Sequence, residues 1–210
     1  MKKIMRSSVM LATILTLALL SAAGQDSGAA GGPAPKPAPA PPAGKIDIGV
    51  TYTYKIAKIA TTTTHFGLQG ASLDGSIPLP RLMKNLSVAF DISGEAKNSI
   101  EPGVNLKQFS FVAGPRFTMR PFRFDGVTPV FYAQGLIGAV HASNSVFPAI
   151  PPTSSANSLA IQAGGGINLP MGQHVGLRAV AFDYTGTRLP NNTNSIQSDC
   201  RISSGFTFHF

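Results

Sequence analysis

The stretch Ser203-Ser204-Gly205-Phe206-Thr207-Phe208-His209-Phe210 alternates between aromatic residues and small or polar ones up to the last position of the sequence. Because successive side chains of a β-strand point to opposite faces, this period of two predicts a strand. Its apolar face carries Phe206, Phe208 and Phe210, and its other face carries the small or polar residues between them. The stretch therefore predicts a strand that separates an apolar environment from a polar one.

The same alternation recurs along the chain and is cleanest in Ile46–Ile56, where every even-numbered residue is aliphatic or aromatic. Eight strands are predicted in this way: Ile46–Ile56, His65–Ser76, Leu86–Gly94, Leu106–Met119, Pro129–Ala142, Leu159–Leu169, Val175–Thr187 and Ile196–Phe210. Strands of about 9 to 14 residues suit a tilted crossing of a bilayer, whereas the strands of a soluble sandwich usually have about 5 or 6. An even number of strands closes into an antiparallel barrel with both ends on one side. The sequence predicts an all-β fold, a transmembrane eight-stranded antiparallel up-and-down β-barrel, with an exported β-sandwich as the alternative.

Two places interrupt the regular pattern. Pro115 has no backbone N–H, so a bulge or a skipped hydrogen bond is expected there. Arg178 and Asp183 have opposite parity in the seventh strand, so one of them faces lipid unless a bulge shifts the phase. The seventh strand is therefore the least certain in its orientation.

The predicted connections are of two kinds. Those at Pro78–Asn85, Arg120–Thr128 and Pro170–His174 are compact, as turns on the periplasmic side would be. Connections on the other side are expected to be longer, and Ala142–Asn157 and Thr185–Ser195 are candidate surfaces for contact with a partner. This asymmetry is expected of a barrel in an outer membrane.

The interior of an eight-stranded barrel is filled by side chains and is not a wide channel. The candidate charge network in this lumen consists of Asp47, Asp91, Arg116, Arg178, Asp199 and Arg201. Opposite charges in such a confined space should pair, since an unpaired buried charge is costly. The network is interpreted as a structural plug. The alternative is a narrow gated conduit in which broken Arg–Asp pairs admit ions.

The N-terminal residues have the three parts of a secretory signal. Basic residues at Lys2, Lys3 and Arg6 precede an apolar run at Val9–Leu20, and small residues follow at 21–24. The apolar run is shorter than the roughly 20 residues that a spanning helix needs, which disfavours a membrane anchor. We therefore expect a signal peptide at 1–24, a Pro/Ala/Gly-rich periplasmic linker at 25–45 and the barrel domain at 46–210.

The formal net charge is +8, but the basic residues are scattered, so nucleic-acid binding is not expected. A positive balance suits contact with anionic lipopolysaccharide. The single cysteine, Cys200, has no partner for an internal disulfide and is expected to face lipid as a small apolar residue.

A lipid-modifying enzyme is a further alternative, because His141 and Ser143 lie two residues apart and hence on one strand face. A His can activate a Ser hydroxyl in this way, and a Glu completes the arrangement. The two glutamates, Glu95 and Glu101, are expected in the preceding external loop, where they do not complete it. The other histidines are dispersed, Gly164-Gly165-Gly166 has no following Lys to form a phosphate loop, and no metal-ligand spacing is present. No catalytic, cofactor or metal site is therefore predicted.

The C-terminal stretch resembles the signal read by the barrel assembly machinery, a pattern polar-x-Gly-x-x-apolar-x-aromatic. The residues that carry this signal are Ser203, Gly205, Phe206, Phe208 and Phe210. The body resembles the transmembrane domain of outer-membrane protein A and the related protein X, and more closely a family of predicted acidobacterial barrels. The segments that carry the second resemblance are Ala113–Phe117, Val130–Gly138, Leu177-Arg178, Asp183-Tyr184 and Arg201–Phe210.

This resemblance implies a fold and a location in the bacterial outer membrane, not a reaction. The expected role is structural or surface-interacting, without enzymatic activity. A small porin-like pore is the first alternative, and a lipid-A-modifying enzyme the second. The expected partners are outer-membrane lipids, lipopolysaccharide and the assembly machinery, and the protein is expected to be a monomer.

Overall fold

The computed structural model describes residues 46–58, 65–101, 104–120, 127–147, 152–191 and 195–210. Eight strands make up the fold: β1 (Asp47–Lys58), β2 (His65–Pro78), β3 (Leu86–Glu101), β4 (Val104–Met119), β5 (Val130–Phe147), β6 (Thr153–Pro170), β7 (Val175–Thr187) and β8 (Gln197–His209). No helix among the described residues combines the length and the apolar character needed to cross a bilayer. The expected signal peptide at 1–24 and linker at 25–45 lie outside the described residues.

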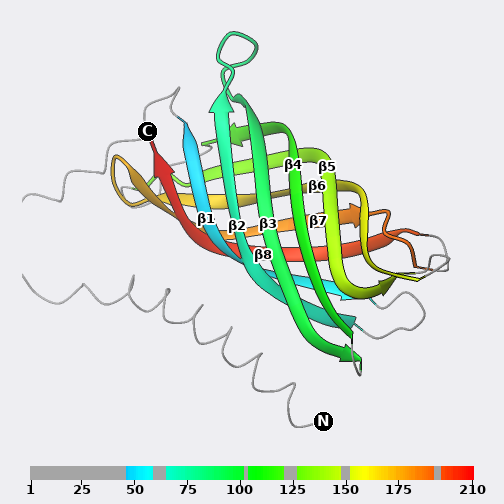
Figure 1. Cartoon of the computed structure of the whole chain (residues 1–210). Coiled ribbons are helices and arrows are strands. Elements are labelled where there is room, and N and C mark those ends of the chain that lie inside the picture. Colours follow the sequence, from blue (N-terminus) through cyan, green and yellow to red (C-terminus); the bar gives the residue numbers. More distant parts are fainter. Residues whose placement is uncertain (1–45, 59–64, 102–103, 121–126, 148–151, 192–194) are drawn as a thin grey trace, which may run out of the picture. The chain divides into compact units, whose positions relative to one another are not determined.

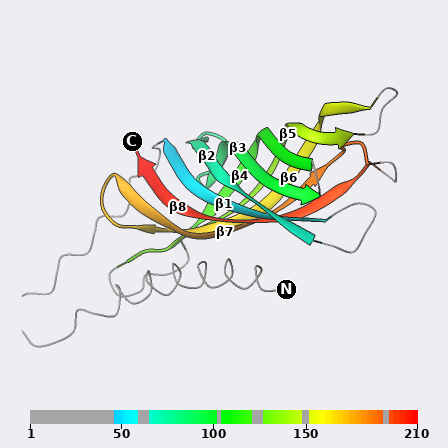
Figure 2. The same cartoon turned by 60° about the horizontal axis from the view of Figure 1, so that its bottom comes forward.

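Each strand pairs antiparallel with its neighbours in sequence, and β1 pairs with β8 to close the barrel. Figure 1 shows β8 lying beside β1 along this seam. The predicted eight-stranded antiparallel barrel is confirmed. We call the end where β1 begins and β8 ends the base, and the opposite end the loop end. Figure 2 shows that the strands, which form the barrel wall, run obliquely around it.

The seam brings two backbones close together at Gly205. This residue lies opposite Thr51, and a Cβ atom at its position would collide with the carbonyl oxygen of Val50. Only glycine permits this approach without a shift of the backbone, so the seam requires glycine here.

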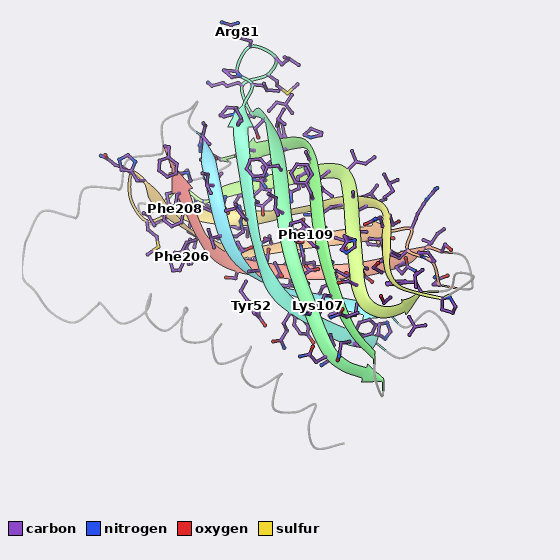
Figure 3. The ribbon with its side chains drawn as sticks, viewed as in Figure 1. Tyr52, Arg81, Lys107, Phe109, Phe206 and Phe208 are labelled. Carbon is purple, nitrogen blue, oxygen red and sulfur yellow. The ribbon has the colours of Figure 1, made fainter. Side chains whose placement is uncertain are left out.

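Inward and outward residues alternate along the strands as predicted. In β8, Asp199, Arg201, Ser203, Thr207 and His209 are buried, whereas the residues between them face outward. Phe206 and Phe208 lie on the outer face of the wall, toward the base (Figure 3). The wall therefore presents an apolar outer face, and its inward-facing side chains are buried within the barrel.

Three of the predicted strand ends at the loop end are wrong, whereas His65 and Thr187 bound β2 and β7 as predicted. β3 continues to Glu101 rather than ending at Gly94, and the β5–β6 hairpin occupies most of the predicted loop Ala142–Asn157. Ser143 pairs with Ser155, and Phe147 pairs with Thr153 across an irregular register. Polar residues and prolines suggested a loop, but a strand pair outside lipid does not need an apolar face. The β3–β4 and β5–β6 connections are thus extended by paired strands over their described residues.

Two local irregularities agree with the sequence-based expectations. The register of β7 shifts against both neighbours between Arg178 and Ala181, as in a β-bulge, so Arg178 and Asp183 both face the lumen. At Pro115 the pairing of β4 with β5 is interrupted and resumes in the same register at Arg116. The bulge in β7 therefore resolves the conflict of parity in that strand.

Candidate functional site

The lumen is the only region of the described residues in which many charged groups converge. Its base half is organised around Asp74 of β2, which accepts hydrogen bonds from two arginines of distant strands. Arg178 Nη2 and Arg116 Nη2 lie 3.0 and 3.1 Å from Asp74 Oδ1, and Arg178 Nη1 also pairs with Oδ2. All three side chains are buried. One carboxylate therefore joins β2, β4 and β7 across the lumen.

The space for this cluster comes from Gly49 on β1, directly opposite Asp74. A Cβ atom at Gly49 would lie 2.5 Å from Asp74 Oδ2 and 3.2 Å from Arg178 Nη2. Tyr132 of β5 covers the other side of the arginines. The Cζ atoms of Arg116 and Arg178 lie 4.6 and 5.2 Å from the centre of its ring. These distances suit cation–π contact, which stabilises the two guanidinium groups in the dry interior.

The middle of the lumen is organised around Arg201 of β8. Its Nη2 atom donates to Asp91 Oδ2 at 2.8 Å and to Asp183 Oδ2 at 3.0 Å, and its Nη1 atom donates to Asp91 Oδ1 at 3.1 Å. Glu95 Oε1 lies 3.9 Å from the same Nη1 atom. Arg201 is among the most deeply buried side chains of the molecule. A single guanidinium thus joins Asp91 of β3 to Asp183 of β7, with Glu95 of β3 close by.

Gln134 and Lys55 extend these contacts into one connected set. Gln134 Oε1 accepts from Arg116 at 2.7 and 2.9 Å, and its Nε2 donates to Asp183 Oδ1 at 3.1 Å. Lys55 pairs with Glu95 and donates to Gln108 Oε1 at 3.2 Å. We call this set the charge network; its members are Lys55, Asp74, Asp91, Glu95, Gln108, Arg116, Gln134, Arg178, Asp183 and Arg201.

Two cross-strand pairs in the charge network carry like charges. Asp74 lies opposite Asp91, and Lys55 lies opposite Arg201. Directly opposed like charges are destabilising on their own. Here each pair is balanced by groups that reach across the lumen from other strands, so the charge network is stable only when it is complete.

An apolar cluster fills the lumen toward the loop end. Leu68 is fully buried, and Val140 and Phe147 of β5 are nearly so. The buried apolar side chains of this cluster are Ala57, Leu68, Ala89, Leu106, Val112, Leu136, Val140, Ala142, Phe147, Ala160 and Leu189. Most of them come from the loop-end halves of their strands. The lumen thus contains a charge network centred toward the base and an apolar cluster centred toward the loop end, and the two meet where Lys55 lies opposite Leu68.

The six residues of the predicted network do not all lie in the charge network of the structure. Asp91, Arg116, Arg178 and Arg201 are buried and form the expected ion pairs. Asp47 lies apart from these ion pairs, at the base, where it is partly exposed and pairs with His209, whose Nδ1 lies 2.6 Å from Asp47 Oδ1. Its position is the first of β1, where the lumen opens to solvent. Asp199 is buried but forms no ion pair with a described residue.

Sequence reasoning missed Asp74 and Glu95, and it left Asp183 unassigned. Asp74 was detectable, because Ser72, Asp74 and Ser76 alternate with outward-facing apolar residues. The apolar residues Phe66 and Leu68 obscured this pattern, because they have the same parity as Asp74 and would suggest that this face of β2 meets lipid. Leu68 in fact faces the lumen. Glu95 was expected in an external loop, but β3 continues past it and places it in the lumen.

The residues of the predicted assembly signal occupy both faces of β8. Ser203 is buried in the lumen, and Gly205 lies at the close approach described above. Phe206, Phe208 and Phe210 are exposed on the outer face. Cys200 is also exposed on the outside of β8, as expected. Nothing in these positions tests recognition by the assembly machinery, which stays a prediction.

His141 and Ser143 do not form the arrangement of a hydrolase. Both face outward from β5, whereas Glu95 lies inside the barrel and pairs with Lys55. His141 Nδ1 instead lies 2.6 Å from Oδ1 of Asn157 on β6. Among the described residues, no group of three His, Cys, Asp or Glu side chains is arranged to hold a metal ion.

The fold places the chain in the structural class of small eight-stranded outer-membrane β-barrels. Ail, the attachment invasion locus protein of Yersinia pestis, solved in complex with the heparin analogue sucrose octasulfate, is similar with a TM-score of 0.53 and 18% identity, over 80% of this chain and 99% of Ail. Neisserial surface protein A is similar with a TM-score of 0.61 and 13% identity, over 79% of this chain and 97% of that protein. No family model and no curated protein matches the sequence. The closer resemblance to predicted acidobacterial barrels stays a prediction.

Proposed function

We propose that this chain is an outer-membrane β-barrel with a closed lumen, which acts through its wall and its outer surface and not as an enzyme or a channel. The observation that carries this proposal is the burial of many charged and apolar side chains in the lumen, with the charge network centred toward the base and the apolar cluster toward the loop end. An ion that enters from the base meets the paired side chains of the charge network. Toward the loop end it meets the side chains of the apolar cluster, which themselves offer no polar group to replace its hydration shell, beside the buried side chains of Thr187 and Asp199.

The role that fits a closed barrel is structural support of the envelope or contact with a partner at the surface. The exposed apolar wall supports a location in lipid, with Phe111, Ile137, Ile161 and Phe206 each about half exposed. In this location the base faces the periplasm and the loop end faces outward. Outer-membrane lipids and lipopolysaccharide are then the first partners of the wall, and the assembly machinery acts on the chain before it folds.

Conductance in a planar bilayer tests the closed lumen. The refolded full chain is expected to insert without unitary current steps. A variant in which Leu68 and Val140 are both replaced by Ser is expected to raise the frequency of current steps, because it makes the apolar cluster polar. Regular steps from the wild-type protein would overturn the closed-lumen role. The outer-membrane location is tested separately, by partition of the protein between membrane fractions and by a shift in electrophoretic mobility on heating.

A small ion pore is the second candidate, and one observation favours it. Five buried side-chain atoms make no hydrogen bond to another described residue: Thr53 Oγ1, Glu95 Oε1, Gln162 Nε2, Arg201 Nε and Thr207 Oγ1. Buried polar atoms are ordinarily satisfied, by ordered water where protein partners are missing. Water at these atoms would provide part of a path through the charge network, though not through the apolar cluster.

A further inference from the structure

The outward faces of β4, β5 and β6 carry a polar patch near the loop end that the closed-lumen role does not use. Two rows of directly opposed residues form it. Phe109 lies opposite His141, which lies opposite Asn157; Lys107 lies opposite Ser143, which lies opposite Ser155. All face outward, because Leu106, Gln108 and Ala142 are buried in the lumen. We call Lys107, His141, Ser143, Ser155 and Asn157 the wall patch.

The wall patch lies next to the apolar band. In the next row toward the base, Phe111 lies opposite Ala139, which lies opposite Leu159, and the row after that contains Ile137 and Ile161. Phe109 itself is 55% exposed. Figure 3 shows Lys107 beyond Phe109 along β4, on the side away from Arg81. Polar groups and apolar side chains thus meet on one continuous stretch of wall.

The charge of the wall patch is not neutralised. Lys107 is exposed and forms no ion pair with a described residue. Arg188 adds a second exposed cation at the edge of the patch, where its backbone N–H donates to Ser158 Oγ at 2.9 Å. Asp74, Asp91, Glu95, Asp183 and Asp199 are all buried in the lumen, away from this face. Among the side chains that the structure describes, this part of the outer wall is therefore basic.

His141 is held in one orientation within the patch. An amide oxygen only accepts hydrogen bonds, so His141 Nδ1 donates to Asn157 Oδ1 and Nε2 points away from that contact. In the protonated ring Nε2 is a donor as well. Hydroxyls of Ser143 and Ser155 and the amide of Asn157 add groups that both donate and accept, as saccharide hydroxyls require.

We propose that the wall patch, with Arg188 at its edge, binds the phosphorylated saccharide headgroup of a glycolipid in the outer leaflet. Lys107 and Arg188 bind phosphate groups, and the Ser and Asn side chains contact the saccharide. The acyl chains of the same molecule lie against Phe109, Phe111 and Leu159. This inference rests on the outer-membrane location proposed above. A free polyanion fits less well, because it has no acyl chains to cover the apolar rows beside the patch.

The test compares two matched double variants of the full chain in zwitterionic detergent. One is Lys107→Gln with Arg188→Gln in the patch. The control is Lys84→Gln with Arg81→Gln, which removes one Lys and one Arg from the exposed β2–β3 turn at the base. Binding of bisphosphorylated lipid A is followed by native mass spectrometry, and folding of each variant is verified by its electrophoretic shift on heating.

The patch variant is expected to bind bisphosphorylated lipid A about 10- to 30-fold more weakly than wild type, since each basic side chain at an anionic surface contributes on the order of 1 kcal/mol. The control is expected to stay within about twofold of wild type, on the same basis. Dephosphorylated lipid A should bind the wild-type protein and the patch variant with equal affinity. The proposal would be overturned if the patch variant and the control lost the same affinity for bisphosphorylated lipid A. It would also be overturned if the patch variant lost as much affinity for the dephosphorylated lipid as for the bisphosphorylated one.

Two further probes test the chosen ligand class. Phosphatidylglycerol carries phosphate without a saccharide, and sucrose octasulfate carries sulfate without acyl chains. Both are expected to bind more weakly than lipid A, and binding as tight as that of lipid A by either would refute a glycolipid site. Failure here is distinguishable from failure of the proposed function. Regular current steps together with the expected binding of lipid A would refute only the closed lumen. An absence of current steps together with equal binding of all the lipids would refute only the glycolipid site.

Discussion

The charge network and the apolar cluster fill the same lumen in opposite ways. In the charge network, Arg201 pairs with both Asp91 and Asp183, so the loss of this one group takes a cation from two buried carboxylates. In the apolar cluster, each side chain adds its own buried area, and the loss of one methyl group leaves the other contacts in place. The charge network should therefore fail as a unit, whereas the apolar cluster should weaken by degrees.

The difference also bears on what each region contributes. Buried ion pairs often contribute little net stability relative to apolar residues of the same size, yet breaking one is strongly destabilising. Two like-charged cross-strand pairs make this dependence stronger here. We infer that the charge network fixes the register and closure of the strands, while the apolar cluster supplies most of the stability inside the lumen.

The largest effect is expected for Arg201→Ala. It leaves the buried carboxylates of Asp91 and Asp183 without their shared cation and should lower the free energy of unfolding by about 3–5 kcal/mol. Urea unfolding in phosphatidylcholine vesicles measures this change. Arg188→Ala removes an exposed arginine and serves as the control, with an expected change within about 0.5 kcal/mol.

A double variant sharpens this prediction. Asp91→Ala removes the main partner of Arg201, so Arg201→Ala with Asp91→Ala should cost less than the sum of the two single changes, by about 0.5–3 kcal/mol. Strict additivity of the two substitutions would show that the charge network does not act as a unit.

The next largest effect is expected in the apolar cluster. Leu68 is fully buried, so Leu68→Ala should cost about 2–4 kcal/mol through lost burial and a residual cavity. Leu68→Met keeps the volume and should cost less than about 1.5 kcal/mol. The same unfolding assay compares the two variants, and a loss as large for Met as for Ala would contradict graded packing.

The sequence predicted the strand count, the closure and the inward face of most strands, because the period of two depends only on which face meets lipid. The apolar cluster was not predicted, since inward-facing Leu106, Leu136 and Val140 look like lipid-facing residues when their strand is read alone. Which apolar face is inside follows only from the neighbouring strands. The register between strands decides which face of a strand points into the lumen, and alternation within one strand does not reveal it.

The charge network was predicted in part for the same reason. Arg116, Arg178 and Arg201 were identified from parity, but their partner Asp74 was not, because glycines on both sides blur the pattern of β2. Pairing across the lumen joins residues about 100 positions apart, such as Arg178 and Asp74, separated by 104. Only the closed barrel brings such residues together.

A smaller effect is expected where the backbone makes room for the charge network. Gly49→Ala places a methyl group against Asp74 and Arg178 and should cost about 1–3 kcal/mol through overpacking. Gly94→Ala is the matched control, because no atom lies within 4 Å of a Cβ at that position. Its unfolding midpoint should not fall below that of wild type, and equal losses at both glycines would indicate a general strand effect instead of a specific collision.

The smallest effect is expected at Tyr132, where the charge network meets an aromatic ring. Tyr132→Phe keeps the ring over Arg116 and Arg178, whereas Tyr132→Leu removes it and leaves both guanidinium groups facing aliphatic carbon. The Leu variant should therefore be less stable than the Phe variant by about 1–2 kcal/mol, the range of cation–π contact in a desolvated site. Urea unfolding of the two variants measures the difference directly. Equal stability would mean that the carboxylates alone hold the arginines, and that the ring only fills space, as the side chains of the apolar cluster do.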